Sequence, residues 1–327
     1  MRRWRRLMGM KQILVMMMVA VLLGCEKFSP PVKIANPIIE ESVRISLQKP
    51  RGKLTEADLR KVTGLDLSLT TITDAGFKEV AKLKKLEWLN LQETQISDAG
   101  FKEAAKLKKL TNLNLTSTQI TDVGLKEVAK LQNLTKLYLS GTQTTDEGLK
   151  DVAKLKKLEV LILGGTEITN VGLKEVAKLQ NLTSFTLSDT QITDVGLKEV
   201  AKLQMLQELN LGGTQITDEG IKDVAKLQNL RVLWLYDTQI TDAGLKDMAR
   251  LKNLEVLNLK GTEITNAGTK ELAKLQNLEV LNLKGTEITF AGVYELLGVL
   301  PNCTIPLDKL PDTNKTHKSK TRKSKTP

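Results

Sequence analysis

The chain has 327 residues, of which 27% are charged and only 3% are aromatic, and its formal net charge at pH 7 is +11. A chain of this length could hold two ordinary globular domains. The excess charge lies at the ends, because residues 1–24 carry five basic groups and no acids and residues 308–327 carry seven basic groups and two acids. The body between them is close to neutral, so we expect no nucleic-acid partner.

The N-terminus has the pattern of an export signal. A basic stretch precedes the apolar run Ile13–Gly24. Twelve residues are too few to cross a bilayer core, which takes about 20 residues in a helix. They suit the apolar region of a signal peptide, so residues 1–24 are predicted to be one.

The apolar run ends in Leu22-Leu23-Gly24-Cys25. This tetrad resembles the lipobox of bacterial lipoproteins, and the resemblance implies that Cys25 is lipidated and becomes the first residue of the mature chain. The protein is then exported and lipid-anchored to the cell membrane or the outer membrane, facing the periplasm or the surface. Several acyl chains on one residue hold a protein stably at a membrane. The alternative is an ordinary signal peptide with a chance cysteine.

Residues 25–37 contain three prolines and no periodic apolar pattern, and are predicted to be a tether between the lipid and the body. The chain has one further cysteine, Cys303. If Cys25 is lipidated, no internal disulfide can form, and Cys303 is predicted to be a small buried side chain.

Residues 38–62 are predicted to be a helical N-terminal cap. Apolar residues favour a short helix over 38–48, and Thr55 with Asp58 three residues later forms a capping box that opens a second one. The stretch 36–68 resembles the N-terminal cap of bacterial internalin-like repeat proteins. A cap is needed because the first repeat would otherwise expose its apolar end to water.

Residues 63–307 are predicted to be a solenoid of ten 24-residue units and a closing strand at Thr304–Leu307. The segment Leu86–Ile96, LEWLNLQETQI, fits the leucine-rich-repeat pattern. Each unit predicts a short strand, a turn and a short helix. The helix opens at Thr-Asp, as in Thr121-Asp122, either of which can accept hydrogen bonds from the amides of the first turn.

Two further columns recur in every unit. The glycine column, represented by Gly124, predicts close packing of the helix against its neighbour. The threonine column, from Thr70 to Thr286, predicts hydroxyl groups that satisfy buried backbone groups in the turns.

Strands stack about 4.8 Å apart whereas helices need about 10 Å, so the body must curve. We therefore expect an α/β solenoid, a leucine-rich-repeat horseshoe with a parallel β-sheet on its concave face and short helices on its convex face, and we expect a monomer. The ITDxGL motif and the turn threonine resemble the ribonuclease-inhibitor-like subclass, whose members bind proteins.

No catalytic constellation is evident. The sole histidine, His317, lies in the basic C-terminal segment, and no Cys/His cluster has metal-ligand spacing. Carboxylates alternate with lysines, as on a solvated helix surface. We predict no enzyme activity, no metal and no cofactor; the alternative is paired-acid chemistry that uses a concave acid such as Glu208.

The units differ from one another mainly in the columns that flank the strand leucines, which point out of the concave face. Both tryptophans after residue 24 and two of the three tyrosines after it fall in these columns. Large aromatics on a rigid surface are common binding anchors. The predicted ligand-binding residues are Trp88, Tyr138, Glu208, Arg231, Trp234, Tyr236 and Asp237, with Trp234 and Tyr236 at the centre. The alternative is that the aromatics only cover the sheet.

Residues 308–327 have almost no apolar residues and are predicted to be a disordered basic tail. Such a tail can hold anionic lipid or envelope polymers, and the alternative is a solvated tail with no partner. The leading hypothesis is a non-catalytic, protein-binding module anchored to the cell envelope, with a protein ligand of unknown identity. The alternative is a structural spacer or adhesion lipoprotein that links the membrane to anionic polymers through its tail.

Overall fold

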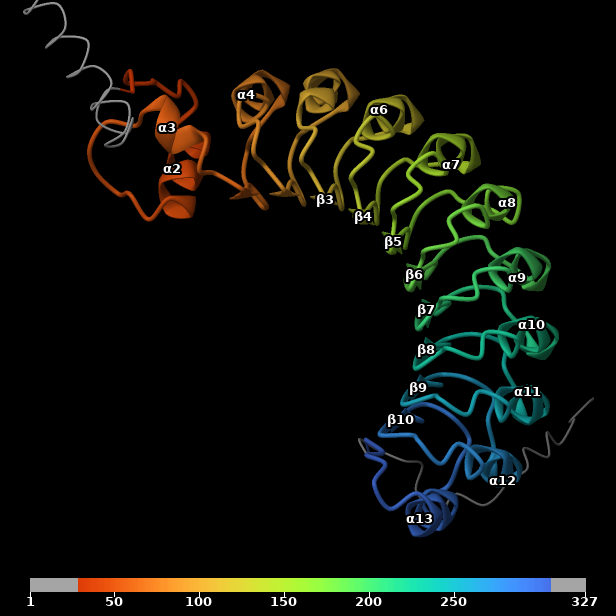
Figure 1. The fold of residues 1–327 in the computed structure, drawn as a ribbon. Helices are drawn as coiled ribbons and strands as arrows, with labels where there is room; N and C mark the ends of the chain where they lie inside the picture. The colour runs from red at the N-terminus through yellow and green to blue at the C-terminus, as the bar shows by residue number, and fades with distance from the viewer. Residues whose placement is uncertain (1–28, 307–327) are drawn as a thin grey trace, which may run out of the picture.

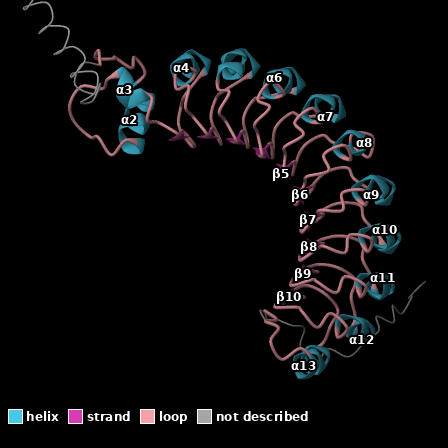
Figure 2. Cartoon of the chain, viewed as in Figure 1, coloured by secondary structure: helices cyan, strands magenta, loops and turns pink. Residues whose placement is uncertain are grey.

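The computed structural model describes residues 29–306 as one curved body (Figure 1). Ten parallel strands form one open sheet in the order of the sequence, β1 to β10. They line the inner side of the arc, and the helices of the units lie on the outer side (Figure 2). The predicted α/β solenoid is confirmed.

Each strand is three residues long. The strands are β1 (Gly64–Asp66), β2 (Trp88–Asn90), β3 (Asn112–Asn114), β4 (Lys136–Tyr138), β5 (Val160–Ile162), β6 (Ser184–Thr186), β7 (Glu208–Asn210), β8 (Val232–Trp234), β9 (Val256–Asn258) and β10 (Val280–Asn282). The central residue of every strand is buried, and the strands pair in register, so that Leu89 aligns with Leu65 and Leu113. The constant spacing therefore stacks equivalent side chains in straight columns across the sheet.

The helices are short. They are α2 (Pro37–Ser46), α3 (Glu56–Leu59), α4 (Asp74–Val80), α5 (Asp98–Phe101), η2 (Lys102–Lys106), α6 (Asp122–Val128), α7 (Asp146–Val152), α8 (Leu173–Val176), α9 (Asp194–Val200), α10 (Asp218–Val224), α11 (Asp242–Met248), η3 (Asn266–Gly268), α12 (Thr269–Leu272) and α13 (Phe290–Val299). Their inward residues, such as Leu125 and Val128, join the strand leucines in a single buried core.

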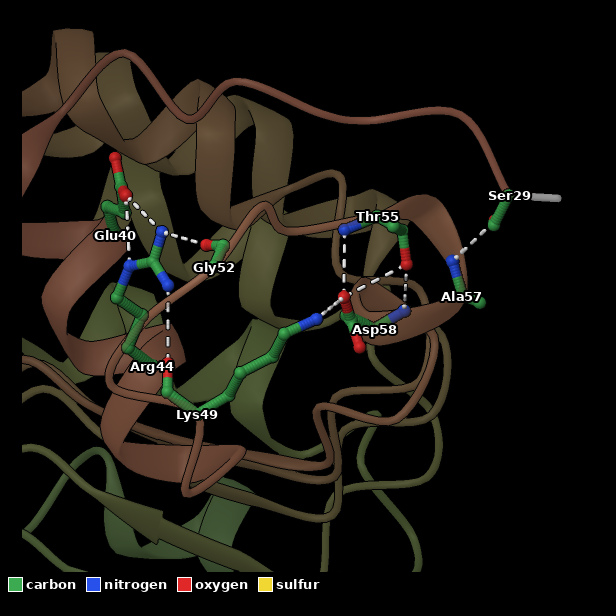
Figure 3. A network of polar contacts seen from close by, with 8 residues as sticks. All are labelled: Ser29, Glu40, Arg44, Lys49, Gly52, Thr55, Ala57 and Asp58. Carbon is green, nitrogen blue, oxygen red and sulfur yellow. Dashed lines mark hydrogen bonds and ion pairs between the residues drawn. The ribbon is translucent and has the colours of Figure 1, made fainter. Parts of the chain in front are cut away.

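The N-terminal cap consists of α2 and α3. Asn36 caps α2 by accepting hydrogen bonds from the amides of Ile38 and Ile39. The predicted capping box is present at α3, where the Asp58 amide donates to the Thr55 hydroxyl and the Thr55 amide donates to the Asp58 carboxylate. Ion pairs within the cap brace both helices (Figure 3).

The segment expected to be a tether belongs partly to the cap. The Val32 amide donates to the Leu54 carbonyl at 2.8 Å, Ser29 Oγ accepts from the Ala57 amide at 3.0 Å, and Ile34 is buried. Among the described residues, the packed body therefore includes the segment from Ser29 and does not start at residue 38. These contacts join residues more than twenty positions apart, which the local composition did not indicate.

The two residues of the helix-opening Thr-Asp pair have different roles, which the sequence did not predict. Thr121 accepts a hydrogen bond from the Val123 amide, as expected of a cap. The Asp122 carboxylate instead accepts two hydrogen bonds from Thr145 of the next coil. The same bridge joins most neighbouring coils, so the aspartate column links the helical side of the solenoid from unit to unit.

The glycine column is explained by this bridge. A methyl group on Gly148 would lie 2.3 Å from Asp122 Oδ1, which confirms the predicted close approach and identifies the preceding coil's aspartate as the neighbour. The threonine column also has the predicted role, within each unit: Thr118 Oγ1 donates to the Leu115 carbonyl at 2.7 Å.

At the C-terminal end, Thr304 forms an isolated bridge with Val280, which is the described part of the predicted closing strand. Cys303 is buried as predicted, and its burial raises the pKa of the thiol to about 11. The expected signal peptide, Cys25 and the basic tail lie outside the described residues. Among residues 29–306, no helix has the length and apolarity required to span a membrane.

Candidate binding surface on the concave face

The concave face is built from the residues that flank each buried strand leucine. The register aligns Lys136, Val160, Ser184, Glu208 and Val232 in one column. The next column along the strands is Tyr138, Ile162, Thr186, Asn210 and Trp234. Strands β4 to β8, which carry these two columns, lie in the middle of the inner side of the arc (Figure 1).

Asparagine is the usual residue of the second column, and it has a structural role. Asn114 Oδ1 accepts from the Thr116 amide at 2.9 Å, and Asn210 Oδ1 accepts from the Gly212 amide at 3.0 Å. Such a side chain closes the turn after the strand. The coils that carry Tyr138, Ile162, Thr186 or Trp234 lack this acceptor. On four strands, therefore, the turn-closing hydrogen bond of asparagine is absent, and a different side chain lies on the concave face.

Two of the predicted site residues, Tyr138 and Glu208, lie in one groove. This groove has a volume of about 420 Å³, and we call it the β4–β7 groove; it is lined by Lys136, Tyr138, Val160, Ile162, Thr183, Ser184, Gln207 and Glu208. Ser184 Oγ donates to Glu208 Oε2 at 2.9 Å, which orients the carboxylate. The groove offers an apolar side next to charges of both signs.

Trp234 and Tyr236 stand on the far side of the same surface. Both are half-buried. The Tyr236 ring lies over Gly212, since a methyl group on that glycine would be 2.2 Å from Tyr236 Cε1. Trp234 on β8 is three strand spacings from Ile162 on β5, or about 14 Å. Smaller polar residues, Thr186 and Asn210, occupy the strands between them. We call Tyr138, Ile162, Thr186, Asn210, Trp234 and Tyr236 the concave patch.

Arg231 belongs to a neighbouring groove at the edge of the sheet. Its guanidinium makes a bidentate ion pair with Glu255, with Nε–Oε1 and Nη2–Oε2 distances of 2.8 and 2.7 Å. The hydrogen bond and charge of Glu255 raise the pKa of the Arg231 guanidinium above its ordinary value. The lateral groove, of about 480 Å³, is lined by Gln207, Asn229, Arg231, Asn253, Glu255, Asn277 and Glu279. It meets the β4–β7 groove at Gln207.

Asp237 has a backbone role as well as a charge. Its φ of +52° is in the left-handed region, at a turn position where Gly213 and Gly261 occupy the neighbouring coils. Aspartate tolerates this conformation better than most residues. Its carboxylate lies 3.7 Å from Lys260 Nζ, so it presents a partly neutralised charge beside Tyr236.

Trp88 is separate from the other predicted residues. It is 37% exposed and lies over Gly64 at the N-terminal end of the sheet. There it lines a small apolar hollow with Ile45 of α2. The structure thus groups Tyr138 and Glu208 in one groove, places Trp234, Tyr236 and Asp237 beyond it, and leaves Trp88 near the cap.

Four residues that line the β4–β7 groove were not among the predicted site residues: Lys136, Val160, Ile162 and Ser184. Ile162 carried a usable signal, because it replaces the asparagine that the column otherwise favours. Among residues 29–306, no three His, Cys, Asp or Glu side chains are placed to hold a metal ion.

The family described as "Leucine-rich repeat region" matches residues 157–304, and the family described as "Leucine Rich repeat" matches residues 106–129 and 130–153. The chain is a leucine-rich-repeat protein. No curated protein is significantly similar to it. Solenoids of this kind use their extended concave surfaces for binding and typically serve as protein-interaction modules.

Solved structures agree with this assignment. This leucine-rich-repeat protein is similar to an internalin from Listeria monocytogenes, with 25% identity, a TM-score of 0.61, and coverage of 86% of this chain and 92% of the internalin. It is also similar in fold to a leucine-rich-repeat protein of Leptospira interrogans, with 24% identity, a TM-score of 0.53, and coverage of 76% and 73% of the two chains.

Proposed function

We propose that this protein is a non-catalytic, protein-binding module of the bacterial cell envelope that holds its ligand on the concave patch. The main support for this proposal is that four coils have another residue in place of the turn-closing asparagine: Tyr138, Ile162, Thr186 and Trp234. Replacement of this residue on four strands of one surface is expected where the new side chains contact a ligand. Ile162 and Trp234, whose strands are about 14 Å apart, flank the smaller side chains of Thr186 and Asn210.

The polar groups around the patch favour a protein surface as the ligand. Lys136, Glu208 and the Asp237–Lys260 pair place charges of both signs beside the large side chains of the patch. Aromatic residues are enriched in protein–protein interfaces, and the rims of these interfaces are polar. Charges at the rim contribute more to orientation and association rate than to affinity.

The envelope location is proposed from the sequence Leu22–Cys25 and its resemblance to a lipobox. A lipid on Cys25 would hold the solenoid at the membrane by its N-terminal cap, with the concave face free to meet soluble or surface partners. Cys25→Ser should move the protein from the membrane fraction to the soluble fraction, and intact mass should show the loss of the acyl chains. A mass change no larger than the exchange of sulfur for oxygen would contradict lipidation.

Comparison of envelope proteins retained by the chain and by chosen variants tests the binding proposal. Ile162→Asn with Trp234→Asn introduces the residue that other coils carry in this column, as at Asn114, Asn210 and Asn258, so the large side chains are replaced by one that the repeat already accommodates. Val195→Glu on the convex side is the matched control, because Glu147 and Glu219 occupy the same column. We expect a ligand to be lost from the first variant and kept by the second. Equal retention by all three chains would refute the proposal.

The second candidate is a spacer that links the membrane to anionic envelope polymers. The seven basic groups of residues 308–327 favour it. Deletion of these residues should then abolish retention on anionic polymers, whereas the concave variants should have no effect. The opposite pattern is expected of the protein-binding module.

A further inference from the structure

The N-terminal cap and the first repeat form an apolar groove with a basic rim on the helical side of the solenoid. The groove has a volume of about 410 Å³ and is lined by Val32, Glu56, Leu59, Arg60, Lys82, Lys84 and Lys85. Val32 and Leu59 are half-buried, and the basic side chains are exposed. Long basic side chains cover apolar surface with their stems and keep their charges in water. The groove is therefore apolar at its base and positive at its edge.

Glu56, the acid that lines the groove, and Glu79 of α4 are already paired. Glu56 pairs with Arg60 at 3.1 Å, and Glu79 pairs with Lys82 at 2.8 Å. Lys84 donates a hydrogen bond to the Ala81 carbonyl but has no carboxylate partner among residues 29–306. Lys85 likewise has no ion-pair partner within this range. The net positive charge of the groove thus comes from Lys84 and Lys85.

Comparison between coils shows that these lysines are not a requirement of the repeat. The positions equivalent to Lys84 and Lys85 are Gln-Asn at 132–133, 180–181, 228–229 and 276–277. Lysine pairs occur in the first, second and fourth coils, and the pair at Lys108 and Lys109 extends the positive edge from the groove along the next coil. The positive charge of this edge is concentrated at the N-terminal end.

The chain also brings this end close to the proposed lipid. Val32 lines the groove, and Ser29 is bonded to α3 through the Ala57 amide (Figure 3). Cys25 precedes Ser29 by four residues, which span at most about 14 Å when fully extended. A lipid on Cys25 would hold the groove within that reach of a membrane.

We propose that the groove and the lysine pairs beside it dock on the anionic phospholipid headgroups of the membrane, and so orient the solenoid. A single flexible anchor fixes no direction, whereas a second contact on the cap would set which way the concave face points. The inference depends on the proposed lipidation only for the closeness of the groove to the membrane. The charge complementarity of the groove is independent of it.

The test uses the chain from residue 25 onward carrying Cys25→Ser, so that neither the signal peptide nor an acyl chain contributes. Binding is measured to phosphatidylcholine vesicles with and without phosphatidylglycerol. Each lysine near an anionic surface strengthens binding about fivefold, so Lys84→Gln with Lys85→Asn should weaken binding to the anionic vesicles by more than about tenfold. Lys156→Gln with Lys157→Asn makes the same change three coils away and should weaken it by less than about threefold.

Both double variants introduce residues that the chain itself uses at those positions, so a change in melting temperature is not expected. Equal weakening by the two pairs would overturn the proposal, because it would indicate a diffuse charge effect. Equal binding to neutral and anionic vesicles, or a preference for a soluble anionic polymer over the vesicles, would also overturn it. Because the variant chain has no lipid and the concave patch is unchanged, failure here is distinguishable from failure of the anchor or of the ligand site.

Discussion

Asp122 receives two hydrogen bonds from Thr145 on the next coil: the Thr145 amide donates to Oδ1 at 2.9 Å and its hydroxyl donates to Oδ2 at 2.7 Å. Because the hydroxyl proton points at Asp122, the oxygen can accept from the Glu147 amide at 3.2 Å. One threonine thus caps its own helix, α7, and ties it to the preceding coil.

Asn170 makes a different connection with Thr193. Its Oδ1 accepts from the Thr193 amide at 3.0 Å, but its Nδ2 donates to the Thr193 hydroxyl at 2.8 Å. The hydroxyl is then an acceptor for the amide group, and it makes no capping hydrogen bond to α9. The same pair of columns therefore exists in a capped and an uncapped form within one chain.

The substitutions Asp122→Asn and Asn170→Asp should change the free energy of unfolding in opposite directions. Asp122→Asn should lower the free energy of unfolding by about 1 kcal/mol, the typical value of an N-cap, and Asn170→Asp should raise it by about 0.5–1 kcal/mol. Urea denaturation followed by circular dichroism measures both. A destabilising Asn170→Asp would contradict the role given to the aspartate column.

Two glycines in helices should respond differently to alanine. In Gly148→Ala the new methyl group would lie 2.3 Å from Asp122 Oδ1 and 2.7 Å from Leu125 Cδ1, so the free energy of unfolding should fall by about 1–3 kcal/mol. Gly298 has no neighbouring atom within 4 Å of such a methyl group. Gly298→Ala should therefore raise stability by about 0.5–1 kcal/mol, as expected for a helix position without strain. Thermal unfolding of the two variants provides the comparison, and similar losses in both would be inconsistent with the proposed crowding.

The N-terminal cap should make the stability of the folded chain depend on pH. The hydrogen bond from Lys49 lowers the pKa of the Asp58 carboxyl in the folded chain. Since the folded pKa is depressed, the stabilisation is present above the unfolded value, about 3.9, and is lost as the pH falls through the folded value. At neutral pH, Asp58→Ala should cost about 1 kcal/mol, and the difference from the parent chain should shrink below about pH 4. Melting temperatures measured against pH test this, and a difference that stays constant down to acid pH would exclude it.

Trp234→Asn should be nearly neutral for folding. The loss of a half-buried indole costs about 1–2 kcal/mol, and the new asparagine can accept a hydrogen bond from the Tyr236 amide, which contributes about 1 kcal/mol. The net change should be below about 1 kcal/mol in denaturant titrations. A larger loss would mean that Trp234 is mainly a structural residue, and the variant would no longer be a clean probe of binding.

The 24-residue period predicted the strands, the curvature and the outward columns, because each depends only on the spacing of leucines and on side-chain alternation. The cap was predicted from local patterns at Thr55 and Asp58. Contacts between coils were not predicted: the Asp122–Thr145 bridge and the packing of Ser29 on α3 join residues that are distant in sequence. For the same reason, the groove that Tyr138 and Glu208 share was not predicted, because it forms only where strands β4 to β7 lie side by side.

Position-specific crosslinking tests most directly whether the concave patch holds a protein. A photoreactive phenylalanine analogue in place of Thr186 would lie on the floor between Ile162 and Trp234, and the same analogue in place of Val195 would lie on the convex side. After irradiation in intact cells, the first position should yield a discrete crosslinked protein that the second does not, and Ile162→Asn with Trp234→Asn should abolish it. The absence of any crosslink at position 186, or the same products at both positions, would contradict a ligand on the concave face.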